Sequence, residues 1–276
     1  STSRRQRQMC IRDSDSVILF NFRGDRAIEL SMAFDVEGFN SFDKCGYDPK
    51  VLYAGMLQYD GDLKIPQHYL VQPPVIKHTL TEVLCAAGIH EYALSETQKF
   101  GHVTYFWNGN RSGKFSDVLE TYMEVPSDIV PFEQRPWMKA AEITDEVVSA
   151  IASGKYRMVR FNFPNGDMVG HTGSLEATIC SMEALDLQLG RLLAVVERLH
   201  GVAIITADHG CDPSYTKTTD HTREYVPYLI CGKGVKPGVD LGTKLCFGTI
   251  AHTICDYLGV DASTLDGKSV LGDILK

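Results

Sequence analysis

The chain has 276 residues, of which 44% are hydrophobic and 22% are charged, the composition of an ordinary globular protein. Its formal net charge of −8 argues against nucleic acid or an anionic membrane as the main partner, but not against a small anionic substrate. We expect neither a signal peptide nor a membrane span, because no run approaches the ~18 apolar residues that a membrane helix needs.

Residues 1–15 are basic and polar, do not begin with Met and show no helical or strand periodicity. We expect a disordered or artefactual tail here, and a natural protein that continues upstream. Residues 16–21, SVILFN, form a continuous apolar run that is typical of a buried parallel strand. A helical pattern follows at 25–34, a second strand is predicted within 51–59, and residues 67–74 have the composition of a linker.

Beyond residue 78 the pattern alternates between helices and strands. Gly88 and Gly154 follow two of the predicted helices, and glycine commonly ends a helix because it tolerates a positive φ angle. The alternation predicts an α/β fold, with a mostly parallel sheet and helices on both faces. Residues 99–106 fit either a helix or a strand. The predicted helices are 79–87, 137–153, 175–199 and 248–258, and the predicted strands are 91–94, 122–125, 158–163, 202–206 and 226–231.

Eight cysteines are scattered along the chain without a CxxC pair. Cys85 in VLCAAG and Cys231 in YLICG lie in apolar runs. This usage predicts buried thiols rather than a disulfide framework, and therefore a protein of a reducing compartment such as the cytoplasm.

Two segments place Asp and His directly after predicted strands. FNFPNGDMVGHTG contains Asp167 and His171, and the segment that begins VAIITADHG contains Asp208 and His209, with His221 in the loop beyond. Open α/β sheets bind ligands at the carboxyl ends of their strands. Carboxylate and imidazole ligands suit Zn²⁺, Mn²⁺ or a similar ion. One such histidine alone is usually an ordinary loop residue, but two independent clusters predict a metal site.

The strings DMVGHTG and TADHG, in this order, resemble the alkaline phosphatase superfamily, and most of all its cofactor-independent phosphoglycerate mutases. The resemblance implies an alkaline-phosphatase-like fold and two divalent metal ions. Asp167, His171 and His221 would hold one ion, and Asp208 and His209 would help to hold the second. In the family, an aspartate and a nucleophilic serine from an N-terminal region complete the second site. The resemblance favours manganese, although ligand types alone do not separate it from zinc or cobalt.

FNFRGDR, which ends at Arg26, resembles a string of the family's separate transferase domain. The resemblance implies that Arg23 and Arg26 grip the phosphate and carboxylate of phosphoglycerate, because a guanidinium presents paired donors to an oxyanion. The alternative is a surface arginine pair in a salt bridge with Asp25. Lys99, in SETQKFGHVTYFWNGN, corresponds to a lysine near the family's metals that stabilises the transferring phosphoryl group. A solvated lysine is an equally open interpretation.

One segment departs from the mutase pattern. Residues 211–229, CDPSYTKTTDHTREYVPYL, look more like phosphopentomutase, a sister family in which a short string after ADHG closes on a similar TDH motif. His221 aligns as a ligand in both families. Phosphopentomutase therefore stays open as an alternative, as do a hydrolytic phosphatase or sulfatase relative and an inactive metal-binding fragment.

The resemblance implies interconversion of 3-phosphoglycerate and 2-phosphoglycerate in glycolysis, through a phosphoserine intermediate whose nucleophile lies upstream. Residues 16–72 would end the transferase domain, and residues 73–276 would form the phosphatase-like, metal-binding domain. We expect a monomer that binds a small-molecule substrate. We also expect little or no turnover from this chain by itself.

Overall fold

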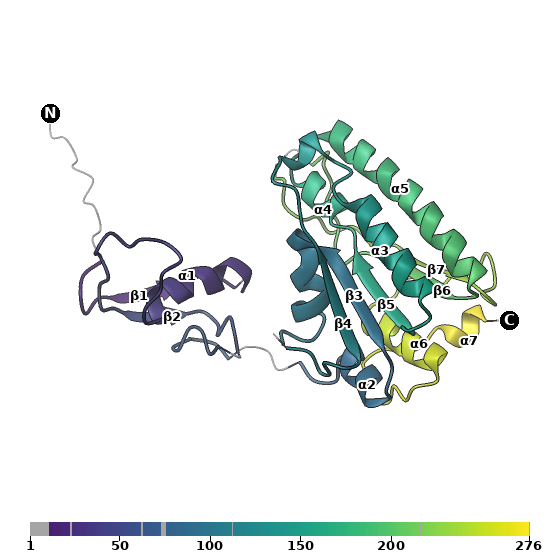
Figure 1. Cartoon of the computed structure of the whole chain (residues 1–276), viewed down its shortest axis with the longest axis horizontal. Coiled ribbons are helices and arrows are strands. Elements are labelled where there is room, and N and C mark those ends of the chain that lie inside the picture. Colours follow the sequence, from purple (N-terminus) through teal and green to yellow (C-terminus); the bar gives the residue numbers. More distant parts are fainter. Residues whose placement is uncertain are drawn as a thin grey trace. The chain divides into compact units, whose positions relative to one another are not determined.

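The computed structural model describes residues 11–22, 24–61, 63–72, 76–111, 113–215 and 217–275, without the side chains of Asp25 and Arg26. The chain divides into two compact units (Figure 1). The smaller unit comprises residues 1–76 with 110–112, and the larger comprises residues 77–109 with 113–276.

The smaller unit contains two parallel strands and one helix: β1 (Ser16–Leu19), α1 (Asp25–Asp35) and β2 (Leu52–Gly55). The helix covers one face of the strand pair, where the rings of Phe34 and Tyr53 stack with their centroids 4.8 Å apart. The other face of the unit is open, so that Ile18 is 56% exposed. The parallel strand predicted at residues 16–21 is present over Ser16–Leu19, but it is half-buried or exposed rather than buried, because a single helix covers one face of the strand pair.

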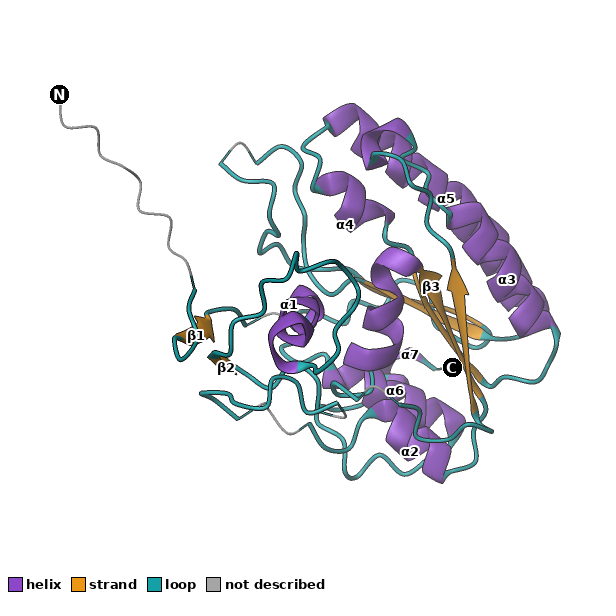
Figure 2. Cartoon of the chain, turned by 60° about the vertical axis from the view of Figure 1, so that its left-hand side comes forward, coloured by secondary structure: helices purple, strands orange, loops and turns teal. Residues whose placement is uncertain are grey.

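The larger unit is built on a parallel sheet with the strand order β4–β3–β5. Its strands are β3 (Glu91–Glu96), β4 (Glu120–Val125) and β5 (Met158–Asn162). Helices cover both faces, as predicted (Figure 2). The helices α3 (Ala140–Ala152) and α5 (Leu175–Arg198) pack on one face, and α2 (Leu80–Ala86) and α6 (Gly248–Leu258) on the other.

The hydrophobic core of the sheet follows the alternation of side chains along its strands. Tyr92 and Leu94 point towards α3, where they contact Ile143 and Val147, both fully buried. Glu91 points to the opposite face, where it accepts hydrogen bonds from Thr81 and Cys85 of α2. Gly88 and Gly154 follow α2 and α3 with φ angles of +71° and +66°, as the sequence predicted.

A second pair of strands, β6 (Val202–Thr206) and β7 (Tyr228–Gly232), is antiparallel. Among the strand pairings of the described residues, β6 pairs with β7 and not with β5. The residues of β6 are consequently half-buried or exposed. The sequence predicted a buried strand from the apolar string VAIIT, and this detail is corrected by the structure.

Residues 99–106 are helical rather than extended, which settles the alternative that the sequence left open. A 3₁₀ turn, Thr97–Lys99, leads into a π-helical turn, His102–Phe106. The remaining helical segments are the 3₁₀ turn Phe132–Gln134, the short helix α4 (Asn165–Gly170) and the C-terminal turn α7 (Leu271–Ile274).

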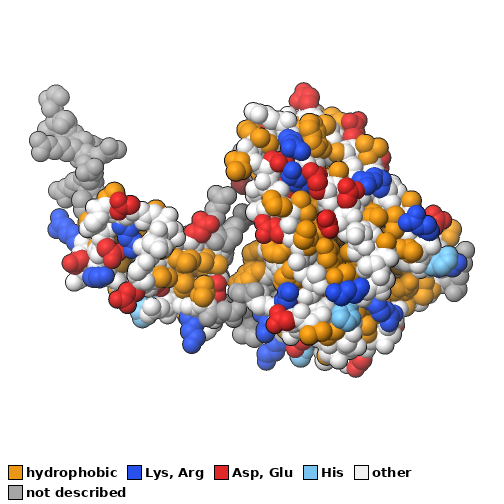
Figure 3. Space-filling view, in the orientation of Figure 1, with side chains coloured by type: hydrophobic (Ala, Val, Ile, Leu, Met, Phe, Trp, Pro, Cys, Tyr) orange, Lys and Arg blue, Asp and Glu red, His pale blue; other side chains and the backbone are white. Residues whose placement is uncertain are grey.

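The surface of the larger unit mixes charged and apolar side chains. Figure 3 shows acidic and basic groups interspersed over one face, among patches of hydrophobic side chains. Within the described residues, no helix combines the length and the apolar character that crossing a membrane requires. The seven described cysteines are free, but Cys45 and Cys246 are exposed, so the prediction of buried thiols is wrong for these two. Cys10 lies outside the described residues.

Candidate metal centre

The short helix α4 carries Asp167 and is followed directly by His171. Helical spacing of four residues brings the two side chains to the same face, and His171 Nε2 lies 3.1 Å from Asp167 Oδ1. The helix is anchored by Asn165, a fully buried residue whose amide donates to the carbonyl oxygen of Pro136 at 3.0 Å. Val169, also fully buried, packs beside Met138. Tight packing of α4 therefore fixes the direction in which Asp167 points.

The loop after β6 brings two more histidines to the same carboxylate oxygen. His221 Nε2 lies 3.2 Å and His209 Nε2 lies 4.0 Å from Asp167 Oδ1. The imidazole rings of His209 and His221 stack with centroids 3.6 Å apart. A β-bridge between Gly210 and Thr222 explains this pairing, because it holds the two loop segments next to each other. Three imidazole nitrogens thus surround one carboxylate oxygen.

The other hydrogen-bonding nitrogens of these rings orient them. His171 Nδ1 bonds to the carbonyl oxygen of Thr219, and His209 Nδ1 lies 3.2 Å from the carbonyl oxygen of Gly210. Metal-binding histidines usually donate one ring N–H to such a carbonyl and present the other nitrogen to the ion. Here the Nε2 atoms face Asp167, which is the orientation that metal ligation requires.

Both carboxylate oxygens of Asp167 are buried, and among the described residues the ammonium of Lys99 pairs with Oδ2 while the three imidazoles lie nearest to Oδ1. Among the ion pairs of the described residues, Lys99 is the partner of Asp167 whose charge does not depend on the protonation of an imidazole. Burial raises the pKa of Asp167, but the hydrogen bond and charge of Lys99 lower it by more, so that the pKa lies below its ordinary value. An ionised, buried carboxylate surrounded by imidazoles fits a divalent cation well.

Lys99 itself is 9% exposed and ends the 3₁₀ turn that follows β3. The sequence left open whether this residue was solvated or belonged to the site. The structure brings it together with Asp167, although 68 residues separate the two in the sequence. Its effect on a phosphoryl group remains a prediction.

Asp208 is less closely associated with the centre. Its side chain is 62% exposed, with Oδ2 3.4 Å from His209 Nε2. Asp208 and His209 border a broad groove along β6 and β7, whose lining includes the exposed side chains of Tyr225, Leu245 and Phe247. The predicted contribution of Asp208 to a second ion stays a prediction.

The predicted substrate-binding arginines belong to the smaller unit. Arg23 lies outside the described residues, and so does the side chain of Arg26. Their proposed contact with phosphoglycerate therefore stays a prediction.

Cys211 lies close to the candidate metal centre, although the sequence did not predict this position. Its sulfur, a carboxylate oxygen of Asp167 and a ring nitrogen of His171 all lie within 4.8 Å of one another. Burial raises the pKa of the Cys211 thiol, and the Asp167 carboxylate adds to this effect. The one feature of the sequence that could have predicted this proximity is that Cys211 directly follows Asp208-His209-Gly210. An isolated cysteine in a loop does not by itself indicate a metal ligand.

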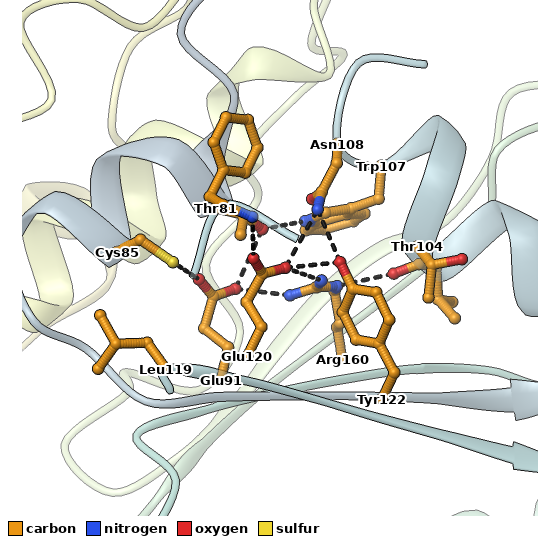
Figure 4. Close-up of polar contacts among 12 residues, drawn as sticks. Thr81, Cys85, Glu91, Thr104, Trp107, Asn108, Leu119, Glu120, Tyr122 and Arg160 are labelled. Carbon is orange, nitrogen blue, oxygen red and sulfur yellow. Dashed lines mark hydrogen bonds and ion pairs between the residues drawn. The ribbon is translucent and has the colours of Figure 1, made fainter. Parts of the chain in front are cut away.

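A buried ion network supports the strand that leads to Asp167 (Figure 4). Arg160, on β5, contacts Glu91 Oε2 at 2.6 Å and lies 3.6 Å from Glu120 Oε2. Its Nε also donates to the carbonyl oxygen of Val103 at 2.9 Å. Val103 belongs to the π-helical turn that follows Lys99, so Arg160 ties this turn to the three strands of the sheet.

The two glutamates of this network have opposite pKa shifts. Burial raises the pKa of Glu91 to about 7, although Arg160 opposes the shift. Burial also raises the pKa of Glu120, but hydrogen bonds led by those from Tyr122 and Asn108 lower it by more. One guanidinium thus faces one carboxyl group whose pKa lies above its ordinary value and one whose pKa lies below it.

Comparisons with known proteins agree with these features. A family model described as the metalloenzyme superfamily matches residues 9–262. The chain is 50% identical over 267 residues to the 2,3-bisphosphoglycerate-independent phosphoglycerate mutase of Trypanosoma brucei brucei, covering 91% of this chain and 48% of that protein. It is 54% identical over 271 residues to a probable enzyme of the same name from Leptospira interrogans, covering 91% and 49%.

A solved structure extends the comparison to the fold. The phosphoglycerate mutase of Leishmania mexicana, crystallised at low cobalt concentration, superposes with a TM-score of 0.86 at 46% identity. The match covers 94% of this chain and 51% of that one. This chain thus spans about half the length of the relatives it matches. None of these three bears the name of the sister family, so the phosphopentomutase alternative gains no support from them.

The resemblance that DMVGHTG and TADHG carry is therefore confirmed, together with an alkaline-phosphatase-like α/β fold. The chain belongs to the metalloenzyme superfamily.

Proposed function

We propose that this chain forms the metal-binding part of a cofactor-independent phosphoglycerate mutase, which interconverts 3-phosphoglycerate and 2-phosphoglycerate by phosphoryl transfer. The observation that carries the proposal is the convergence of His171, His221 and His209 on Asp167 Oδ1, at 3.1, 3.2 and 4.0 Å. The shared identity with named mutases supports the choice of substrate. Because the chain spans about half of each relative, the complete reaction is proposed for the longer protein.

The proposed ligands are Asp167, His171 and His221 for one divalent ion, and Asp208 with His209 for part of a second. Manganese is the first candidate, with zinc and cobalt as alternatives. Such a pair of ions neutralises charge on a phosphoryl group and activates the attacking oxygen when it is bound. The buried carboxylate of Asp167 and the Nε2 atoms that face its Oδ1 support this assignment.

Lys99 is proposed to place a positive charge beside the transferring phosphoryl group. Its ammonium already lies against Asp167 Oδ2 and is largely withdrawn from solvent, where a fixed charge acts more strongly than in water. Arg23 and Arg26 are proposed to bind the phosphate and carboxylate of the substrate. A monomeric state and a cytoplasmic location complete the proposal.

The metal assignment is tested first, by measuring Mn²⁺ binding to the full chain. Asp167→Asn should remove most of the binding, because this carboxylate contacts every proposed imidazole ligand. The matched control is Asp186→Asn, which alters an exposed aspartate on α5 and should bind as the original chain does. Equal stoichiometry in Asp167→Asn and the original chain would reject the assignment.

The reaction is tested in a chimera, since little turnover is expected from this chain alone. The matching half of the Trypanosoma brucei brucei enzyme is replaced by this chain, and 3-phosphoglycerate is supplied with Mn²⁺. Formation of 2-phosphoglycerate, lost on Asp167→Asn, is the expected result. Release of inorganic phosphate and glycerate without 2-phosphoglycerate would indicate a hydrolase and overturn the proposal.

A further inference from the structure

We propose that Arg160 is a positioning residue for Lys99. By holding the carbonyl oxygen of Val103, it fixes the turn that carries Lys99 and so keeps the Lys99 ammonium against Asp167. The inference rests on the proposed function for the role of Lys99 in phosphoryl transfer. It goes beyond that function by giving the buried ion network around Arg160 a role in the site.

The segment that carries Lys99 needs an anchor outside itself. Lys99 ends the 3₁₀ turn Thr97–Lys99, and the π-helical turn His102–Phe106 follows three residues later. Short turns of these kinds are not stable by themselves, because fixing their backbone costs more than their few hydrogen bonds return. The side chain of lysine is also long and flexible. A defined position for the Lys99 ammonium on Asp167 therefore requires a backbone that is held from elsewhere.

The π-helical turn presents one carbonyl oxygen to Arg160. The N–H groups of Trp107 and Asn108 both donate to the carbonyl oxygen of Thr104 rather than to that of Val103. Val103 is buried, and a buried carbonyl group needs a donor. Arg160 Nε supplies this donor at a distance of 2.9 Å. The guanidinium thus takes the place that a backbone N–H would have in a regular helix.

A hydrogen bond connects this turn back to Lys99. Thr104, the neighbour of Val103, donates its hydroxyl group to the carbonyl oxygen of Phe100 at 2.7 Å. Phe100 directly follows Lys99, and Val103 lies four residues beyond Lys99, which is about one helical turn. A shift of the Val103 carbonyl group would therefore be passed on to the backbone of Lys99.

Arg160 is itself held by the sheet, as Figure 4 shows. Its Nη1 lies 2.6 Å from Glu91 Oε2, and its Nη2 lies 3.6 Å from Glu120 Oε2. The same Glu120 oxygen accepts a hydrogen bond from Asn108 Nδ2 at 3.1 Å, so the network also holds the residue that follows the turn. Two nitrogens of the guanidinium thus face the strands β3 and β4, and the third faces the turn at Val103.

A lysine at position 160 would separate the charge of Arg160 from its geometry. Its single ammonium could balance the charge of Glu91 and Glu120, but it lacks the planar fork that also reaches Val103. Arg160→Lys is therefore the variant that tests the proposal. The alternative is that Arg160 only stabilises the fold, and the experiments must exclude it.

Lysine reactivity tests the placement of Lys99 without any metal. The full chain and Arg160→Lys are acetylated with a limiting amount of an N-hydroxysuccinimide ester, and mass spectrometry follows each lysine. Lys99 should react about tenfold or more faster in Arg160→Lys, because the turn loses a hydrogen bond from a charged donor. Lys139, which pairs with Asp128 at 2.8 Å in the same unit, should keep its reactivity. Unchanged reactivity of Lys99, or an equal rise at Lys139, would overturn the proposal.

Two further variants make the test independent of how well Arg160→Lys folds. Thr104→Val removes the hydroxyl link to Phe100 with little change of shape, and it should also make Lys99 reactive. Val147→Ala weakens the core beneath α3, on the opposite face of the sheet, and should leave Lys99 protected. Continued protection of Lys99 in Thr104→Val would contradict the proposed link. A rise in Val147→Ala as large as in Arg160→Lys would show that Lys99 follows general stability, which is the alternative.

Mn²⁺ affinity provides a second readout. The Lys99 ammonium repels a cation bound at Asp167, so Arg160→Lys should raise the Mn²⁺ affinity by up to about fivefold. Combined with Lys99→Met, the same substitution should have no effect, because the charge that it displaces is already absent. An equal change in both backgrounds, or no change in either, would reject the action of Arg160 through Lys99. A chain that binds no Mn²⁺ would reject the proposed metal centre, and the acetylation pattern would still decide the role of Arg160.

Discussion

The Lys99 ammonium forms an ion pair with Asp167 Oδ2, and this contact joins the turn after β3 to the short helix after β5. The same carboxylate presents its other oxygen, Oδ1, to three histidines. We therefore expect Lys99 and a metal ion to contact the same carboxylate through different oxygens. The positive charge of Lys99 should weaken metal binding, although it should favour phosphoryl transfer.

Lys99→Met should strengthen Mn²⁺ binding to the chain while it lowers mutase activity in the chimera. Removing one positive charge close to the site relieves repulsion of at least about 1 kcal/mol, or about fivefold in affinity. Isothermal titration calorimetry and the coupled mutase assay measure the two effects. Lys155→Met alters an exposed lysine and should change neither the Mn²⁺ affinity nor the mutase activity. Weaker metal binding in Lys99→Met would show that the lysine organises the ligands rather than competing with the ion.

His171→Ala should weaken divalent metal binding by about tenfold or more, because it removes a nitrogen 3.1 Å from Asp167 Oδ1. It also removes the bond from Nδ1 to the carbonyl oxygen of Thr219, which orients the ring. His68→Ala, at an exposed position of the smaller unit, is the control. Competition with a fluorescent chelator measures both variants, and equal affinities would exclude His171 from the ligand set.

Arg160→Met should lower the free energy of unfolding by about 3–5 kcal/mol, because it leaves the buried Glu120 carboxylate without its cation. Arg191→Met removes a surface ion pair with Asp145 and should cost about 1 kcal/mol or less. Urea unfolding followed by circular dichroism compares the two. Similar losses would mean that the network around Arg160 contributes no more than a surface pair.

Glu91 should make stability fall as pH rises. Its pKa is about 7 in the folded chain against an ordinary value of 4.5, so between these values the folded state holds a proton that the unfolded state has released. The free energy of unfolding should therefore decline from about pH 4.5 to about pH 7 and level off above, by about 3 kcal/mol at most.

Glu91→Gln cannot titrate and should lose this slope. The measurement is urea unfolding of both chains at pH 5, 6, 7 and 8. Parallel curves for the two chains would show that Glu91 stays ionised beside Arg160 throughout.

Much of the local structure could be predicted because it depends on neighbouring residues. The sequence placed Asp167 and His171 directly after a strand, and the structure puts Asp167 on the short helix α4 that follows β5 and His171 at the C-cap of that helix. Gly88 and Gly154 end helices because they accept positive φ angles that other residues resist. The motifs DMVGHTG and TADHG also identified the superfamily, because they contain the Asp and His residues of the candidate metal centre in a distinctive local sequence.

Contacts between distant segments were decided only by the tertiary structure. From the sequence, Lys99 could equally have been a solvated lysine or a residue of the metal centre, and the structure places it against Asp167. The sequence also gave no reason to expect Cys211 beside Gly170. It also described residues 16–21 and 202–206 as buried strands, although their surroundings cover them only in part. Hydrophobic periodicity records what a segment can bury, whereas burial itself depends on which elements the loops bring against it. Local backbone geometry determines the contact between Asp167 and His171, which are four residues apart. The contacts of Asp167 with Cys211 and Lys99 join residues 44 and 68 positions apart, so they depend on how the whole unit packs.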